Sequence, residues 1–187
     1  MMDNKVIIGI DIGMKGGISI MSAKDCSIIE LIEMPIVKDD KKHKQRFSKF
    51  IDVSKLHEII SNYHSIYGVE ALVIEDIGNI FGIDKFSMYS LGRQRGLIEG
   101  LCNCIGVKVA DYKPKVWQGY MFAKVDKVID VNATIKKTKV YALEVFKKLY
   151  PHLVTKVMKK KNPKDGLVDA TLIGRFYWEM NHDELKV

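Results

Sequence analysis

A short, almost wholly apolar run that ends in an acid is the feature that most constrains this chain. Residues Val6–Ile10 are all apolar, and Asp11 follows them directly. Such a run is typical of a strand whose two faces are both covered. Gly13 lets another backbone or a phosphate approach closely. The pattern predicts a buried strand that carries a carboxylate to one end of a sheet.

Two distant segments show the same combination of apolar residues and acids. Ala71–Ile74 predicts a second buried strand that ends in Glu75 and Asp76, and only one of these two acids should point into a shared site because side chains alternate along a strand. Asp165 and Asp169 open an apolar C-terminal segment and would share one helical face. If the three segments meet, their acids need either raised pKa values or a bound cation.

The expected cation is magnesium or manganese. The three cysteines and five histidines show no paired, zinc-type spacing, whereas carboxylate oxygens suit hard divalent ions. Such a site can hold two ions that stabilise the attacking and leaving oxygens when water displaces a phosphodiester in line.

Periodicity predicts one α/β domain over residues 1–187. The alternating and apolar runs that indicate strands are 6–10, 17–21, 27–34, 71–75 and 107–111. The three- and four-residue spacings that indicate helices are 52–67, 87–105, a short helix from Pro114, 136–150 and 166–178. The first three strands predict an antiparallel meander, and the whole order predicts a mixed five-stranded sheet flanked by helices.

Charge points to a polyanionic partner. The chain carries 30 Lys and Arg against 23 Asp and Glu, a net charge of +7, which favours nucleic acid. Two basic stretches, Lys41–Lys49 and Lys156–Lys164, stand out. The second leads into the acidic segment, so we expect DNA contacts from its lysines, whereas the first is equally consistent with a solvated surface. Those candidate lysines are Lys159, Lys160, Lys161 and Lys164.

The expected compartment is the cytoplasm. An odd number of cysteines without a framework of spacings favours a reducing environment. No run of about 18 apolar residues predicts a membrane span.

The chain carries its acids in three motifs, which are Gly9–Gly13, the strand-terminal Glu75 and the segment Lys164–Ala170. These motifs resemble those of RuvC-like Holliday junction resolvases, with the closest likeness to the phage and poxvirus-type branch. The resemblance implies an RNase H-like fold and a homodimer that cuts four-way DNA junctions by paired, metal-dependent nicks. It also implies that Asp11, Glu75, Asp165 and Asp169 are the catalytic metal ligands, with two Mg²⁺ ions per site for which Mn²⁺ can substitute. A phage origin would place the protein in the cytoplasm of a host cell.

Several alternatives stay open at this point. Asp165 is also a natural helix N-cap, and Asp-x-Gly after a strand occurs in the phosphate loops of sugar kinases and actin-like ATPases, although those folds need two such domains. An RNase H-like nuclease for RNA–DNA hybrids and a non-catalytic junction-binding protein are the rival functions.

Three further side-chain groups each have two interpretations, and a fourth is assigned to the core alone. Lys164 could touch the scissile phosphate or remain a solvated lysine. Phe81, Phe86 and Tyr89 could stack on an opened junction or pack in the core or a dimer. Gly92, Gly96 and Gly100 predict close packing within the subunit or against a partner helix. The aromatic side chains expected to fill the core are Trp117, Phe176, Tyr177 and Trp178, with Trp178 partly exposed.

Overall fold

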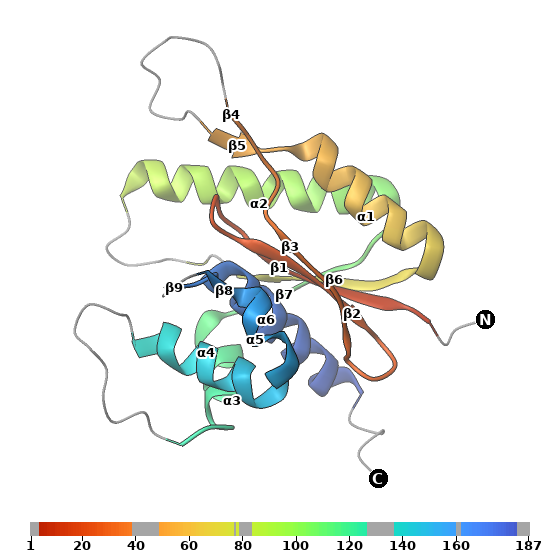
Figure 1. Ribbon diagram of the computed structural model, residues 1–187. Helices are drawn as coiled ribbons and strands as arrows, with labels where there is room; N and C mark the ends of the chain where they lie inside the picture. Colours follow the sequence, from red (N-terminus) through yellow and green to blue (C-terminus); the bar gives the residue numbers. More distant parts are fainter. Residues whose placement is uncertain are drawn as a thin grey trace.

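Strand β1 lies at the centre of a five-stranded sheet in the computed structural model, which describes residues 4–38, 49–76, 78, 84–126, 137–159 and 162–182 (Figure 1). The strands, in their order across the sheet, are β3 (Ile28–Glu33), β2 (Gly17–Ser22), β1 (Val6–Asp11), β6 (Val69–Glu75) and β7 (Val109–Tyr112). β1, β2 and β3 form an antiparallel meander, while β1, β6 and β7 run parallel. The predicted mixed five-stranded sheet is therefore confirmed.

Helices cover both faces of this sheet. They are α1 (Val53–Tyr67), α2 (Lys85–Ile105), α3 (Pro114–Phe122), α4 (Lys137–Leu149), α5 (Val154–Val157) and α6 (Asp165–Asn181), with a 3₁₀ turn η1 (Pro151–Leu153) before α5. In Figure 1, α1 and α2 lie on one side of the sheet, and α3 to α6 lie on the other. Two hairpins were not predicted: β4 (Ile36–Lys38) with β5 (Lys49–Ile51), and β8 (Met158–Lys159) with β9 (Asn162–Pro163).

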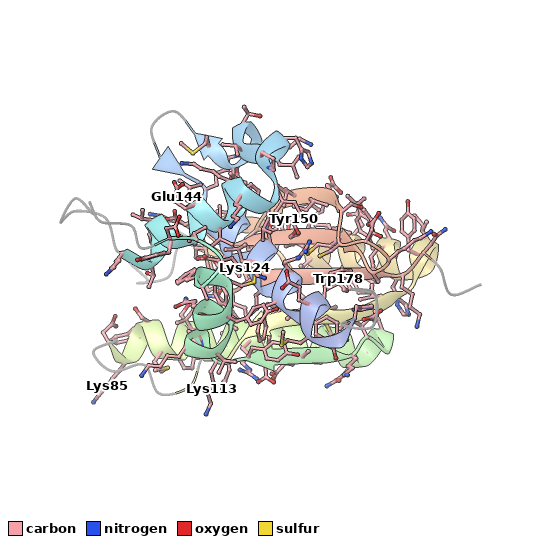
Figure 2. The ribbon with its side chains drawn as sticks, turned by 90° about the horizontal axis from the view of Figure 1, so that it is seen from below. Lys85, Lys113, Lys124, Glu144, Tyr150 and Trp178 are labelled. Carbon is pink, nitrogen blue, oxygen red and sulfur yellow. The ribbon has the colours of Figure 1, made fainter. Side chains whose placement is uncertain are left out.

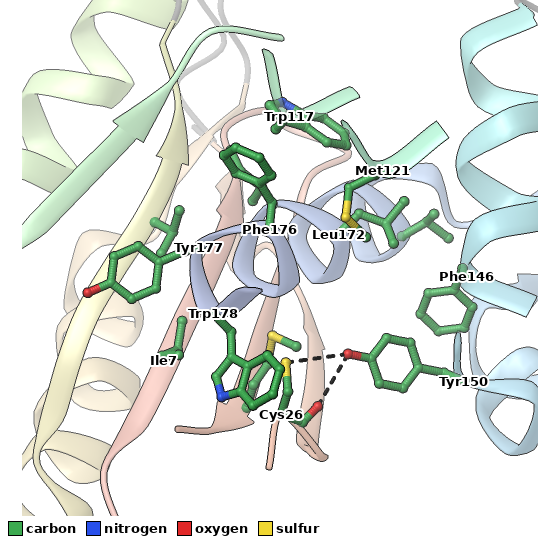
Figure 3. Packing of buried hydrophobic residues seen from close by; sticks show 14 of the residues in the cluster. Ile7, Cys26, Trp117, Met121, Phe146, Tyr150, Leu172, Phe176, Tyr177 and Trp178 are labelled. Atoms are coloured by element: carbon green, nitrogen blue, oxygen red, sulfur yellow. Dashed lines mark hydrogen bonds between the residues drawn. The ribbon is translucent and has the colours of Figure 1, made fainter. Parts of the chain in front are cut away.

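The alternation of side chains along β1 divides the interior into two cores. Ile7 belongs to the core beneath α3, α4 and α6, together with Trp117 and Leu172, as Figure 3 shows. Ile8 points the other way, into the core that holds Leu56 of α1. The apolar run of β1 therefore serves both layers, which explains why no polar residue interrupts it.

Helix α6 lies directly on the first hairpin because glycines remove the side chains that would separate them. A Cβ atom on Gly9 would overlap the carbonyl oxygen of Ala170, and a Cβ atom on Gly166 would overlap backbone atoms of Lys15 and Gly16. A parallel bridge joins Gly16 to Gly166. This contact fixes the start of α6 against the loop that follows β1.

The glycines of α2 do not pack in this way. Within the described part of the chain, nothing lies within 4 Å of the position that a Cβ atom would take on Gly92, Gly96 or Gly100. The expectation of close packing inside the subunit is wrong, because this face of α2 points to solvent. Packing against a partner helix stays a prediction.

The aromatic predictions had mixed outcomes. Trp117, Phe176 and Tyr177 are buried as expected, whereas Trp178 is buried rather than partly exposed, because its indole Nε1 donates to the carbonyl oxygen of Ala23 at 2.8 Å. The side chains of Phe86 and Tyr89 are 48% and 65% exposed, so they do not fill the core. Phe81 lies outside the described residues.

None of the helices in the described ranges combines the length and apolar character that a membrane span requires.

Candidate active site

Asp11 and Glu75 end neighbouring strands. β1 and β6 are parallel and in register at Ile10 and Ile74, so the next residue of each strand is an acid at the same end of the sheet. The sequence left open whether these two strands are neighbours, and the structure places them side by side. Two carboxylates thus converge because each follows a buried strand of similar length.

Helix α6 brings the other two predicted acids to this end. Asp165 is its first residue and Asp169 follows one turn later, while the bridge between Gly16 and Gly166 holds the helix start beside the loop after β1. The negative charges of Glu75 and Asp165 each raise the pKa of Asp11. The four acids therefore lie within range of one another's charge.

Burial and mutual repulsion make the cluster hard to ionise. The pKa of Asp169 is raised to about 8, first by burial and then by the charges of Asp11, Glu75 and Asp165. The pKa of Asp11 is raised to about 6, again first by burial. Burial also raises the pKa of Glu75. At neutral pH these carboxyls cannot all carry charge without a nearby cation.

Trp117 holds the carboxyl group of Glu75. Its indole Nε1 donates to Glu75 Oε1 at 3.0 Å, and the tryptophan is only 2% exposed. It comes from α3, which Pro114 begins directly after β7. The hydrogen bond lowers the pKa of Glu75 against the larger effect of burial. Sequence reasoning assigned this tryptophan to the core alone, although a buried indole N–H requires an acceptor.

Asp76 is engaged elsewhere. Arg95 of α2 contacts Asp76 Oδ1 at 3.1 Å and also pairs with Glu99 at 2.7 Å and Asp111 at 2.6 Å. This contact holds the Asp76 carboxylate against Arg95 of α2. Of the two consecutive acids, Glu75 is the one whose negative charge raises the pKa of Asp169.

The N-cap interpretation of Asp165 is wrong. Lys164 occupies the N-cap position, and no side chain caps the helix there. The Asp165 carboxylate instead pairs with the ammonium group of Lys139, in the first turn of α4. The charge of Lys139 reaches the whole cluster, since it lowers the pKa of both Asp11 and Asp169. The sequence offered no signal for this lysine, because it lies 26 residues before Asp165 in a helix that carries several lysines.

The predicted DNA-contacting lysines are described only in part. Lys164 Nζ pairs with Glu33 Oε1 at 2.8 Å, so its ammonium group is not merely solvated. Lys160, Lys161 and the side chain of Lys159 lie outside the described residues, as does the stretch Lys41–Ser48. Their contacts with DNA remain predictions.

The donor chemistry of the cluster fits a hard divalent cation. Carboxylate oxygens are the ligands that Mg²⁺ and Mn²⁺ prefer, and a bound cation would relieve the repulsion that raises the pKa of Asp169. Among the described side chains, no group of three or more Asp, Glu, His or Cys residues already has an arrangement that could hold a metal ion. The Asp165 carboxylate would have to turn from Lys139 for all four acids to share an ion.

Comparison with known proteins shows the fold. No family model and no curated protein matches the chain. Thermus thermophilus RuvC in complex with a Holliday junction substrate is 16% identical, with a TM-score of 0.54 over 95% of this chain and 96% of that one. The yeast mitochondrial Holliday junction resolvase is 14% identical, with a TM-score of 0.58 over 98% of this chain and 82% of that one. The chain has the RNase H-like fold of these structures, as the resemblance to RuvC-like resolvases implied.

Proposed function

We propose that this chain is a metal-dependent, structure-selective DNA endonuclease that resolves Holliday junctions and other branched DNA by paired nicks. The observation that carries the proposal is the convergence of Asp11, Glu75, Asp165 and Asp169 at one end of an RNase H-like sheet, with the pKa values of Asp11 and Asp169 raised to about 6 and 8. Repulsion among buried carboxylates destabilises the folded state, so such a cluster points to a functional site.

The four acids would hold the cation, Mg²⁺ with Mn²⁺ as a substitute and two ions per site. A cation bound there would stabilise the charge that develops when water attacks a phosphodiester and the leaving oxygen departs. Trp117 fixes one oxygen of Glu75 and leaves the other unconstrained by that bond. Lys139 places a positive charge beside Asp165, where it can also attract a phosphate.

Substrate and assembly follow from the same resemblance. A net charge of +7 favours binding of DNA, and the similar RuvC structure from Thermus thermophilus is a complex with a Holliday junction substrate. A homodimer would place two such sites on opposing strands, which is what symmetric nicking of a junction needs. We further propose one nuclease domain over residues 1–187, membership of the phage and poxvirus-type branch, and action in the cytoplasm of a host cell.

The direct test is strand cleavage on a panel of labelled substrates. A four-way junction, a flap, a linear duplex and an RNA–DNA hybrid are incubated with the wild-type chain, with and without Mg²⁺ or Mn²⁺. The proposal predicts metal-dependent, symmetric nicks in the junction. Preferential cutting of the hybrid would instead indicate a nuclease that recognises 2′-hydroxyl groups. Tight junction binding with no cutting in either metal would indicate a non-catalytic binding protein.

A further inference from the structure

Lys139 forms an ion pair with one of the four predicted metal ligands. Its ammonium group, from the first turn of α4, contacts Asp165 Oδ2 at the start of α6. α4 packs against α6, and its Val145 and Phe146 are fully buried in the core beneath the sheet. The helix that carries Lys139 is therefore fixed relative to the acids, and the flexible four-carbon stem of the lysine is the part that can move.

The ion pair is partly exposed, so it can separate at little cost. The side chain of Lys139 is 45% exposed and that of Asp165 is 32% exposed. Ion pairs in contact with water contribute little to stability, because water solvates both partners once they separate. Asp165 can therefore exchange Lys139 for another cation.

Lys139 also opposes a divalent cation through its charge. It lowers the pKa of both Asp11 and Asp169, so its charge acts on the cluster beyond Asp165. The same positive charge repels a cation that binds these carboxylates. Lys139 thus competes with the cation twice, once by occupying an oxygen of Asp165 and once by repulsion.

Other lysines of α4 engage groups outside the cluster. Lys137 Nζ stands 5.9 Å from the centre of the Tyr141 ring. Lys147 pairs at 2.7 Å with Glu144, which is labelled on the same helix in Figure 2. Of these three lysines, Lys139 is the one whose partner is a predicted metal ligand.

A DNA phosphate offers Lys139 a second partner. A phosphodiester that is cut at the four acids must lie beside the cation that they hold, and Asp165 is one of those acids. The ammonium group of Lys139, which already lies at Asp165, then has this phosphate within reach. Ion pairs with phosphates supply much of the affinity of proteins for DNA. A lysine that leaves Asp165 would therefore strengthen the binding of DNA.

We infer that Lys139 competes with the divalent cation for Asp165 and transfers to a DNA phosphate when the cation binds, so that the cation and DNA bind cooperatively. The inference rests on the proposed function and adds a regulation of that same site. The chain would hold the cation firmly only where a DNA phosphate takes over Lys139. By linkage, each ligand raises the affinity for the other by the same factor.

The first test is the affinity for Mn²⁺ in the absence of DNA, measured by isothermal titration calorimetry at pH 8. Lys139→Gln should bind Mn²⁺ about tenfold more tightly than wild type, because it lacks both the competing ammonium group and its repulsion. Protons also bind the acids more tightly in this variant, but a divalent ion gains about twice as much as a proton from the loss of one positive charge. Unchanged or weaker Mn²⁺ binding by Lys139→Gln would overturn the inference.

Three further variants locate the effect. Asp11→Asn should bind Mn²⁺ much more weakly, which would place the titrated ion at the acids. Lys137→Gln removes the same charge from the same turn of α4 and should bind Mn²⁺ as wild type does. Lys139→Arg keeps a cation beside Asp165, so it should bind Mn²⁺ no more tightly than wild type. Tighter binding by Lys137→Gln or Lys139→Arg would overturn the inference, because the ion pair would then not set the affinity.

The second test measures the coupling with DNA. Binding of a four-way junction is followed by fluorescence anisotropy at constant ionic strength, with EDTA or with Ca²⁺ in place of Mg²⁺. Wild type should bind the junction about tenfold more tightly with Ca²⁺ than with EDTA. Lys139→Gln should show a smaller gain, because it has no lysine to transfer. An equal gain in both proteins would overturn the transfer to phosphate.

The proposed nuclease activity is scored separately, by wild-type cutting of the junction in Mg²⁺. Tighter Mn²⁺ binding and a smaller Ca²⁺ gain in Lys139→Gln, without any cutting by wild type, would support the competition and contradict the nuclease. Cutting by wild type, with equal Mn²⁺ affinity in the two proteins, would do the reverse. Equal Mn²⁺ binding by wild type and Asp11→Asn would contradict both, because the ion would not lie at the acids.

Discussion

Trp117 Nε1 donates a 3.0 Å hydrogen bond to Oε1 of Glu75, and this bond joins the core beneath α6 to the end of β6. The tryptophan is buried among Met121, Phe176 and other apolar side chains (Figure 3). Its ring therefore has little freedom, and the carboxyl group that it holds is positioned by the packing of the core. The relationship makes Trp117 a positioning residue for the candidate site.

Trp117→Phe should lower junction cleavage by on the order of tenfold, because Glu75 loses the donor that orients it. The same change should lower the free energy of unfolding by about 1–3 kcal/mol. Cleavage is measured in single-turnover assays and stability by denaturant titration.

Trp178→Phe is the matched control for that variant. Trp178 is also buried, and its indole N–H also has one acceptor, the Ala23 carbonyl oxygen. Its replacement should cost a similar amount of stability and leave cleavage unchanged. Equal losses of cleavage in both variants would show that Trp117 acts only through stability.

Gly9→Ala should destabilise the chain by about 3 kcal/mol or more, because the new methyl group would overlap the backbone of Ala170 and push α6 away from β1. The displacement would also separate Asp169 from Asp11. Gly96→Ala provides the contrast, since its Cβ atom would meet nothing within 4 Å on an exposed helical face. That change should stabilise the chain by about 1 kcal/mol. Circular dichroism melts check both variants, and a stable, active Gly9→Ala would contradict the close approach of α6.

Stability without metal should fall as pH rises from about 4 to 8. The pKa values of Asp11 and Asp169 are raised in the folded state to about 6 and 8, whereas the unfolded carboxyls titrate near 3.8. In this window the folded state binds more protons than the unfolded state, so the free energy of unfolding decreases with pH. Mg²⁺ should offset this loss and stabilise the chain more at pH 8 than at pH 5. Melting temperatures across this range, with and without Mg²⁺, measure both effects.

Asp11→Asn is the control for that pH dependence. The variant removes one carboxyl group of the cluster and relieves the repulsion at Asp169, so the slope of melting temperature against pH should be shallower and the response to Mg²⁺ smaller. An unchanged slope would show that the acids do not sense one another.

Lys139→Gln should shift the pH profile of cleavage to higher pH and reduce the rate at neutral pH by roughly tenfold. The positive charge of Lys139 lowers the pKa of Asp11 and Asp169, so its removal leaves more of these groups protonated at a given pH. Lys137→Gln, in the same turn of α4 but near the Tyr141 ring, should leave the profile unchanged. A parallel shift in both variants would indicate a general effect of net charge.

The five-stranded sheet could be predicted from the sequence because it depends on local patterns, whereas the meeting of its acids was only a condition of the metal-site prediction. The apolar runs before Asp11 and Glu75 predict buried strands, and parallel neighbours must end at the same edge. The three- and four-residue spacing of α1 predicted that helix in the same way. The β4–β5 hairpin was not predicted, since each strand has only three residues.

The partners of the acids could not be predicted in the same way. Trp117 reaches Glu75 across 42 positions of sequence, and Lys139 reaches Asp165 across 26. Both contacts depend on how α3 and α4 pack beneath the sheet, which no periodicity encodes.

The most direct test of the account uses a supercoiled plasmid with an extruded cruciform, treated with wild type or Asp11→Asn in the presence of Mg²⁺. Two nicks made while the enzyme stays bound convert the plasmid to a linear product, whereas independent nicks give a nicked circle. We predict that wild type yields linear plasmid only when Mg²⁺ is present and that Asp11→Asn binds the cruciform without cutting it. Equal cutting by Asp11→Asn, or cutting by wild type without a divalent metal, would contradict a metal site built on these acids.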